Sequence, residues 1–186
     1  MLAPLKQKGR NMVVYSELIP KEAILQGVGN AKKVAIIACP HCANVCIAYA
    51  KSIPYAKSRG SGVLGMITSK PIAIIQEANN IKALLENKGI TAKITILGKL
   101  LPPCGMTEKG HRKIAELCKD SDCVVALSCI SGCLGMKNAL PKTLKIFPAM
   151  NTIGWLETCS KIEKGYHIID KQKSRVIYAK GHQTSS

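Results

Sequence analysis

Short runs of apolar residues alternate along this chain with stretches in which apolar positions recur at helical spacing. Residues 34–38 (VAIIA) and 124–127 (VVAL) are uninterrupted apolar runs, typical of strands that are buried on both faces of a sheet. Between them Ile74, Ala78 and Ile81 recur every three or four residues, as on the buried side of a helix. The alternation of these two patterns predicts an α/β fold with a mostly parallel sheet.

The predicted elements follow this alternation from one end to the other. We expect strands over residues 13–15, 34–38, 93–97, 124–127 and 144–147, and helices over 20–25, 44–53 and 108–119. Two further helices are expected, one opened by Pro71 and ended by Gly89, and a short one closed by Pro141. Residues 166–169 and 175–179 are expected to pair as a C-terminal β-hairpin around a charged turn.

These elements predict a three-layer α/β arrangement in one domain, residues 13–186, preceded by a loose tail over residues 1–12. Residues 60–65 spell the dinucleotide-binding pattern G-x-G-x-x-G. That pattern functions between a strand and a helix, whereas here a charged segment precedes the glycines. We therefore predict a flexible loop there.

Composition narrows the functional class. The 186 residues are 47% apolar, which excludes a disordered chain. No apolar run has the roughly 18–20 residues of a membrane span. The first residues lack the apolar core of a secretory signal, so we expect a cytoplasmic protein. In a reducing compartment, nine cysteines are expected to bind metal or do redox work rather than form disulfides.

The net charge of +16 does not by itself predict nucleic-acid binding. Basic residues are scattered along the chain, no consecutive run exceeds two, and aromatic residues make up only 4%, too few for rows of base-stacking platforms. The basic surface is instead expected to attract an acidic protein partner or an anionic cofactor.

Two cysteine loops are the main candidate site. Cys39, Cys42 and Cys46 form a C-x2-C-x3-C run directly after the first apolar strand, and Cys129 and Cys133 form a C-x3-C pair after the second. The carboxyl ends of parallel strands lie at the same edge of a sheet, so the two loops are expected to meet there. Soft thiolate ligands at this spacing predict an iron–sulfur cluster or a zinc ion.

We expect the metal ligands to be Cys39, Cys42, Cys46 and Cys129, with Cys133 as either a spare ligand or a packing residue. A 4Fe–4S cluster is the leading interpretation. Zinc on the same sulfurs, with His41 able to replace one, is the first alternative. The other cysteines near these loops, Cys104, Cys118 and Cys123, are interpreted as packing residues.

Two further expectations concern the surroundings of these thiols. Asn151 and Thr152 follow an expected strand, where they would either bind a cofactor by hydrogen bonds or shape the cysteine pocket. Cys39 and Cys42 would also suit a thioredoxin-like dithiol oxidoreductase, because C-x-x-C is the redox motif of that class. That alternative leaves Cys46 and the second loop without a role.

Several segments together resemble the methylenetetrahydrofolate reductase C-terminal domain family, which includes the small iron–sulfur/zinc subunit of acetogenic methylenetetrahydrofolate reductases. The first cysteine loop (residues 34–46, VAIIACPHCANVC) carries most of this resemblance. It is supported by residues 16–20 (SELIP), 127–129 (LSC) and 147–152 (FPAMNT). These segments lie between residues 14 and 159, and they are similar to the family in order and spacing.

The resemblance implies a small α/β subunit that holds a 4Fe–4S cluster on Cys39, Cys42, Cys46 and Cys129. It implies a hetero-oligomer with a flavin-containing reductase or a methyl-transfer subunit of anaerobic one-carbon metabolism. In that case the chain is a redox subunit of an oxidoreductase complex and does no catalysis alone. A zinc-stabilised protein-interaction module and a dithiol oxidoreductase remain as the other two classes of function.

Overall fold

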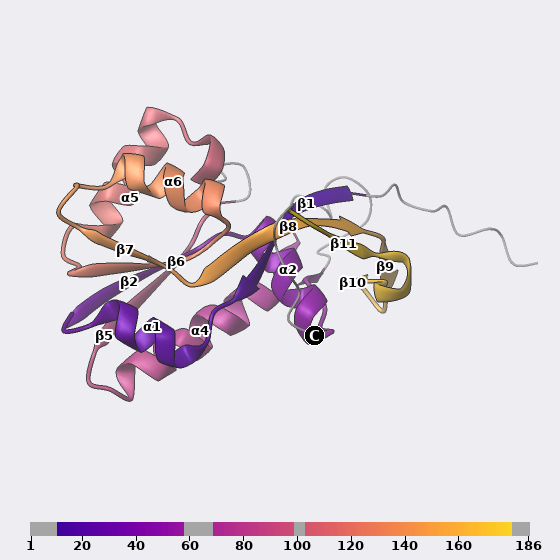
Figure 1. The fold of residues 1–186 in the computed structure, drawn as a ribbon, viewed down its shortest axis with the longest axis horizontal. Coiled ribbons are helices and arrows are strands. Elements are labelled where there is room, and N and C mark those ends of the chain that lie inside the picture. Colours follow the sequence, from indigo (N-terminus) through magenta and orange to yellow (C-terminus); the bar gives the residue numbers. More distant parts are fainter. Residues whose placement is uncertain (1–10, 58–68, 99–102, 180–186) are drawn as a thin grey trace, which may run out of the picture.

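One parallel and two antiparallel sheets form the mixed α/β fold of the computed structural model (Figure 1). The structure describes residues 11–57, 69–98 and 103–179. The expected tail up to residue 10 and the glycine-rich motif at 60–65 lie outside these described residues. Among the described helices, none is long and apolar enough to cross a membrane.

The parallel sheet contains the two apolar runs at its centre. Its strand order is β5 (Thr91–Ile96), β2 (Lys33–Ala38), β6 (Cys123–Leu127) and β7 (Lys145–Pro148), with every neighbouring pair parallel. Every residue of β6 is buried, and so is every residue of β2 after Lys33. The prediction of two strands buried on both faces is therefore confirmed.

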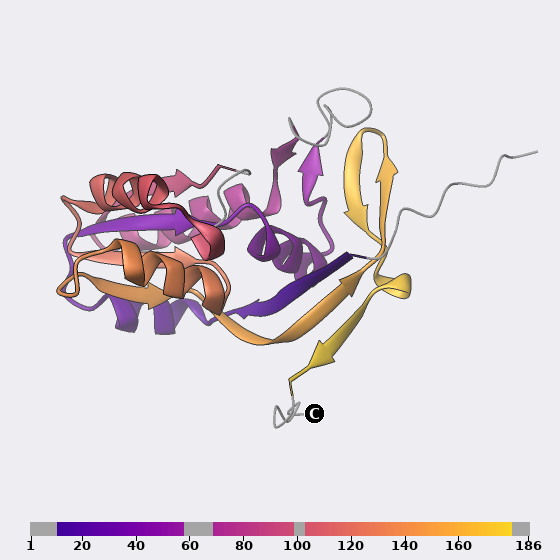
Figure 2. The ribbon, with the colours of Figure 1, turned by 90° about the horizontal axis from the view of Figure 1, so that it is seen from above.

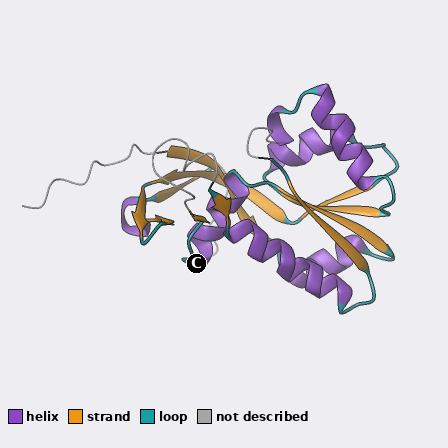
Figure 3. Ribbon diagram, turned by 180° about the vertical axis from the view of Figure 1, so that it is seen from behind, coloured by secondary structure: helices purple, strands orange, loops and turns teal. Residues whose placement is uncertain are grey.

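Helices cover both faces of this sheet (Figure 3). On one face α1 (Lys21–Val28) and α4 (Ala73–Glu86) share a core with Val34, Ile36 and Val125. On the other face α5 (Glu108–Cys118) and α6 (Ile130–Ala139) pack against Ala35, Ile37 and Val124. Alternate residues of β2 thus enter opposite cores, which explains why its run has no polar position.

The antiparallel sheets lie beyond the carboxyl edge of the parallel sheet. One has the order β1 (Asn11–Leu18), β8 (Met150–Thr158) and β11 (Arg175–Tyr178). The other has the order β4 (Lys70–Pro71), β3 (Ala56–Lys57), β10 (Tyr166–Ile169) and β9 (Ser160–Glu163). Figure 2 shows the long strand β8 running from the parallel sheet into this second part of the molecule.

Helix α2 (Cys42–Lys51) joins the two parts of the fold. It packs against β1, α4 and β10 and contributes Ala43, Cys46 and Ile47 to the larger core. The sequence pattern predicted neither β8 nor β9, and it placed only residues 13–15 of β1 in a strand. Beginning at Asn11, β1 also includes the last two residues of the expected tail.

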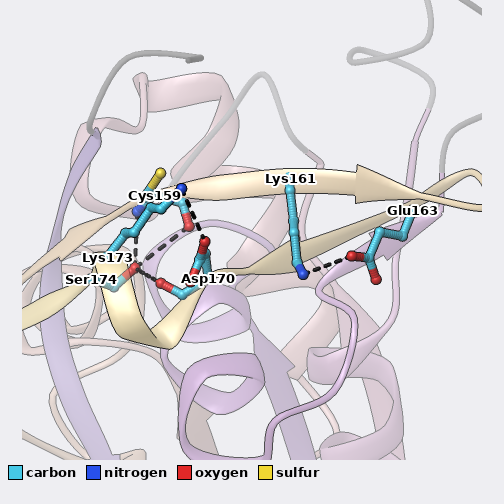
Figure 4. A network of polar contacts seen from close by, with 6 residues as sticks. All are labelled: Cys159, Lys161, Glu163, Asp170, Lys173 and Ser174. Carbon is cyan, nitrogen blue, oxygen red and sulfur yellow. Dashed lines mark hydrogen bonds and ion pairs between the residues drawn. The ribbon is translucent and has the colours of Figure 1, made fainter. Parts of the chain in front are cut away.

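The predicted C-terminal hairpin is wrong. Both strands exist, but β10 pairs with β9 and β3, whereas β11 pairs with β8. Ser174 connects the segment between β10 and β11 to the end of β8 (Figure 4). Its Oγ donates to the carbonyl of Asp170 at 2.7 Å and accepts the N–H of Cys159 at 2.9 Å. This bond ties the turn to the end of β8 and directs β11 along that strand.

We expect Gly27→Ala to destabilise the fold by about 1–3 kcal/mol, although alanine normally favours a helix. A Cβ at Gly27 in α1 would overlap the ring of Phe147 on β7. Chemical denaturation would measure the change in unfolding free energy. Gly105→Ala is the matched control, because a Cβ there meets no atom within 4 Å. A Gly27→Ala variant more stable than the wild type would contradict this packing.

We expect Asp122→Asn to lower the melting temperature at pH 7 and to have a smaller effect in acid. Asp122 Oδ2 accepts the N–H groups of Lys32 and Lys33, both at 2.8 Å, and these donors lower the pKa of the carboxyl group. A lowered pKa gives stability that is present above about pH 4 and is lost as the pH falls through the folded-state value. Melting curves of both proteins from pH 7 to pH 2 would check this, with Asp120→Asn as control. A difference that does not change with pH would contradict it.

Candidate functional site

The carboxyl ends of β2 and β6 lie side by side, as the sequence predicted. Ala38 is paired with Leu127 in the parallel ladder, and the next N–H along, that of Cys39, donates to the carbonyl of Leu127 at 3.0 Å. Cys39 directly follows β2, and Cys129 follows β6 after one serine. The two cysteine loops therefore start from neighbouring positions at one edge of the sheet.

Two helices begin at these cysteines. Cys42 is the first residue of α2, and Cys46 lies one turn further along the same helix. Cys129 is the N-cap residue of α6. Cys39, Cys46 and Cys129 are buried, and Cys42 is half-buried. The loop and the two helix starts bring all four thiols into one neighbourhood.

The thiols of Cys42 and Cys129 form the closest link between the loops. The interaction between these two sulfurs raises the pKa of Cys42 and lowers the pKa of Cys129. The N–H groups of Gly132 and Ser131, at the start of α6, also lower the pKa of Cys129. Of the two sulfurs, the surroundings of Cys129 therefore favour the thiolate more than those of Cys42.

Burial raises the pKa of both Cys39 and Cys46 to about 12. Each nevertheless has a backbone N–H that lowers its pKa, from His41 for Cys39 and from Ser16 for Cys46. The N–H of Val14 acts in the same way on Cys42. All four sulfurs thus have backbone N–H groups beside them, which is the environment that stabilises thiolate ligands of a metal.

Strand β1 supplies two of these N–H groups, and sequence reasoning missed its contribution. Besides its N–H, Val14 offers a carbonyl that accepts a hydrogen bond from Cys46 Sγ at 3.3 Å. Tyr15 and Ser16 are both buried, and the register of β1 against β8 shifts between them, where Ile153 of β8 has no partner in β1. Nothing near Val14 in the sequence signals this position.

Thr152 is hydrogen-bonded next to the thiols, whereas Asn151 is exposed. Thr152 Oγ1 accepts the N–H of Ile130 at 3.0 Å and shares a hydrogen bond of 2.8 Å with Ser16 Oγ. Thr152 therefore fixes the first turn of α6 to β1, next to Cys129. Asn151 is exposed on β8, where it is paired with Glu17. Of the two expectations for these residues, the contacts of Thr152 match the one in which it shapes the cysteine pocket.

Cys133 lies one turn beyond Cys129 in α6. It is half-buried and packs against the core under α5 and α6, and its Sγ donates to the carbonyl of Ser128 at 3.8 Å. Burial raises its pKa to about 11. Its contacts are those of a packing residue, although it lies close enough to Cys129 for their charges to interact.

Cys118 and Cys123 are buried in the two cores, so their prediction as packing residues is confirmed. The same prediction for Cys104 is wrong, because Cys104 is exposed. It lies in the short helix η1 (Pro103–Gly105), which packs against α6.

The position of Cys104 depends on a glycine of α6. A Cβ at Gly135 would overlap the carbonyl of Pro103, so this glycine allows η1 to approach the helix. The close approach of η1 to α6 brings Cys104 near enough to Cys39 that its charge contributes to the raised pKa of Cys39. A glycine in the middle of a helix was the available sequence signal for this close approach.

The thiols lie near one another, but their arrangement is not that of a metal site. In the described ranges no three His, Cys, Asp or Glu side chains are arranged to hold a metal ion as they stand. The donor chemistry fits, because three buried thiols and the half-buried thiol of Cys42 share one neighbourhood. Ser128 Oγ is buried beside Cys39 and Cys129, where it lowers both pKa values, and it has no other partner among the described residues. This hydroxyl is available to an anionic sulfur.

No protein-family model, curated protein or solved structure matches this chain. The chemistry of the site is therefore inferred from its own residues and their geometry.

We expect Thr152→Val to destabilise the protein by about 1–2 kcal/mol. Valine keeps the shape of threonine but leaves the N–H of Ile130 and the hydroxyl of Ser16 without this partner. Denaturant unfolding of the metal-free protein would measure the loss. Thr91→Val, at the exposed start of β5, is the matched control. Equal stability of Thr152→Val and the wild type would show that this link is not needed.

Proposed function

We propose that the chain is a metal–thiolate accessory subunit that carries a 4Fe–4S cluster on Cys39, Cys42, Cys46 and Cys129. The main supporting observation is that these four thiols, from two distant loops, share one neighbourhood in which each has a backbone N–H beside it. In this proposal the parallel sheet and the helices on its two faces are a three-layer scaffold with the site at its carboxyl edge.

The residues around the thiols match the needs of such a group. The N–H groups of β1 and of the first turn of α6 stabilise anionic sulfur, and burial excludes water. The lowered pKa of Cys129 favours its thiolate form, which a metal ligand requires. A cluster bound here would supply one-electron transfer.

The proposed partner follows from the resemblance of the cysteine loops to the methylenetetrahydrofolate reductase C-terminal domain family. It is a cytoplasmic, flavin-containing reductase or a methyl-transfer subunit of one-carbon metabolism, in a hetero-oligomer with this chain. The charge of +16 favours a partner with an acidic docking surface. In this role the chain holds and tunes a redox group and makes no covalent bonds to substrate.

The dithiol alternative is less well supported. A thioredoxin-like pair would use Cys39 and Cys42, but the largest influence on the pKa of Cys42 is its interaction with Cys129 on the other loop. Zinc on the same four sulfurs, in a protein-interaction module, remains the competing outcome of metal analysis.

The test is anaerobic reconstitution with iron and sulfide, followed by metal analysis and by EPR spectroscopy of the reduced protein. We expect about four iron and four sulfide per chain. Single serine substitutions at Cys39, Cys42, Cys46 or Cys129 are expected to reduce the iron content severalfold. Cys159→Ser is the matched control, because Cys159 lies at the end of β8, where its backbone bonds to Ser174 (Figure 4).

Each other outcome identifies a different function. Stoichiometric zinc without sulfide would overturn the electron-transfer role and support the zinc-stabilised module. Insulin reduction that survives both Cys46→Ala and Cys129→Ala would overturn both metal functions. Loss of iron from Cys133→Ser, equal to that from Cys129→Ser, would show that the ligand set is wrong.

A further inference from the structure

The single tryptophan of the chain, Trp155, lies on one face of the antiparallel sheet formed by β1, β8 and β11 (Figure 2). It is paired with Val14 of β1 on one side and with Ile177 of β11 on the other. Directly opposed residues of antiparallel strands point to the same face, so these three side chains form a row across the sheet. Trp155 is 46% exposed and Ile177 is 37% exposed.

The neighbouring row of residues extends this apolar surface. Two positions along the strands, Glu157 is paired with Met12 on one side and with Arg175 on the other. Side chains two positions apart in a strand share a face, so Met12, which is 62% exposed, lies beside the row of Trp155. The tryptophan face, as we call it, consists of Met12, Val14, Trp155 and Ile177.

The opposite face of the same sheet belongs to the larger core. Leu156 is fully buried there, and Val13 and Val176 pack against the same core. An antiparallel sheet with one face in water normally has polar side chains on that face. Apolar side chains on both faces, with a tryptophan among them, are typical of a sheet whose second face binds another protein.

Charge at the rim of the tryptophan face is positive. Arg175 Nε pairs with Glu157 Oε2 at 2.6 Å, but the side chain of Arg175 is 70% exposed and that of Glu157 only 15%, so the pair presents its cation to solvent. Lys173, just before β11, is likewise more exposed than Asp170, with which it pairs. The one acidic residue of β1, Glu17, lies beyond the register shift of that strand. A partner with carboxylates around an apolar pocket would complement this surface.

The same charge disfavours a second copy of the chain as the occupant. Each copy has a net charge of +16, so contact between two copies is opposed by electrostatic repulsion. An acidic protein gains from the same field, which speeds its encounter with the chain and orients it.

The tryptophan face also lies close to the thiols. Val14, whose side chain belongs to this face, accepts a hydrogen bond from Cys46 Sγ through its carbonyl at 3.3 Å. The N–H of the same residue lowers the pKa of Cys42. A protein bound to the tryptophan face would therefore be separated from these thiols by little more than one strand.

We propose that the tryptophan face is the docking surface for an acidic protein partner, with Trp155 as its apolar anchor and Arg175 as a cation at its rim. The inference rests on the proposed function in one respect, which is that the chain works in a hetero-oligomer with a redox protein. Exposed tryptophan and arginine side chains are the residues that most often carry the binding energy of such interfaces.

The first test needs no partner, because the fluorescence of the chain's only tryptophan reports on this face. We expect acrylamide to quench Trp155 readily in the native full-length chain, and sedimentation to show a monomer. Protection of Trp155 in the monomer, or self-association that protects it, would show that the chain itself covers this face and would overturn the inference.

The second test identifies the partner by capture from native extract on the full, reconstituted chain, with nuclease added. Every protein retained by the wild type but not by Trp155→Ser is identified, purified and titrated by calorimetry. We expect an acidic protein whose Kd rises at least tenfold, or about 1.4 kcal/mol, in Trp155→Ser. Its affinity is expected to fall as NaCl is raised from about 0.05 M to about 0.5 M, because salt screens the charges.

The matched control is Ile162→Ser on β9, because Ile162 is 50% exposed but belongs to the other antiparallel sheet. We expect it to leave the Kd unchanged. If Trp155→Ser does not fold, Ile177→Glu and Ile177→Gln provide the second comparison. Glutamate is expected to weaken binding more than glutamine of nearly the same size, because it repels an acidic partner.

Three results would contradict a docking role for the tryptophan face. One is that no captured protein depends on Trp155 or Ile177, the second is that the partner is basic, and the third is that binding is to nucleic acid and is lost with nuclease. Iron and sulfide contents, measured on the same samples, keep the two proposals apart. A zinc-loaded chain that binds its partner through Trp155 would overturn electron transfer alone, and a cluster-loaded chain that ignores Trp155→Ser would overturn the docking surface alone.

Discussion

The parallel pairing of β2 with β6 is the constraint on which the rest of the structure depends. Ala38 is paired with Leu127, and the N–H of Cys39 bonds to the carbonyl of Leu127. Both strands are buried on both faces, so a one-residue slip of either would exchange the residues that fill the two cores. The hydrophobic cores thereby fix the position of two cysteines that are 90 residues apart, without any metal.

Much of the parallel sheet was predictable, because its sequence signals lie within single short segments. An apolar run without a polar position requires burial on two faces, and its end then fixes the edge at which a loop emerges. The antiparallel sheets were less predictable. Strands β8 and β9 alternate only weakly, and β10 with β11 had the pattern of a hairpin. The bond from Ser174 to the end of β8, which separates them, involves residues 15 positions apart in the sequence.

In the candidate site, too, the features with local sequence signals were predictable and those that depend on distant residues were not. Spacing alone selected Cys39, Cys42, Cys46 and Cys129, because chain geometry limits where neighbouring thiols can go. The groups that surround them come from distant segments: Val14 and Ser16 from β1, and Thr152 from β8. Their relation to the thiols depends on the pairing of β1 with β8, which a single sequence does not reveal. Cys104 was misassigned for a similar reason, because its position depends on the absence of a side chain at Gly135.

The β1–β8 pairing also has a consequence for the order of folding. Ser16 and Thr152, which meet beside the thiols, are 136 positions apart in the sequence. Contacts of such high sequence separation are slow to form, and during synthesis they require the ribosome to have released nearly the whole chain. The pairing of β2 with β6 needs the chain only as far as Leu127, so it can form before β8 is available to β1. Until β1 docks, the four sulfurs lack its N–H groups.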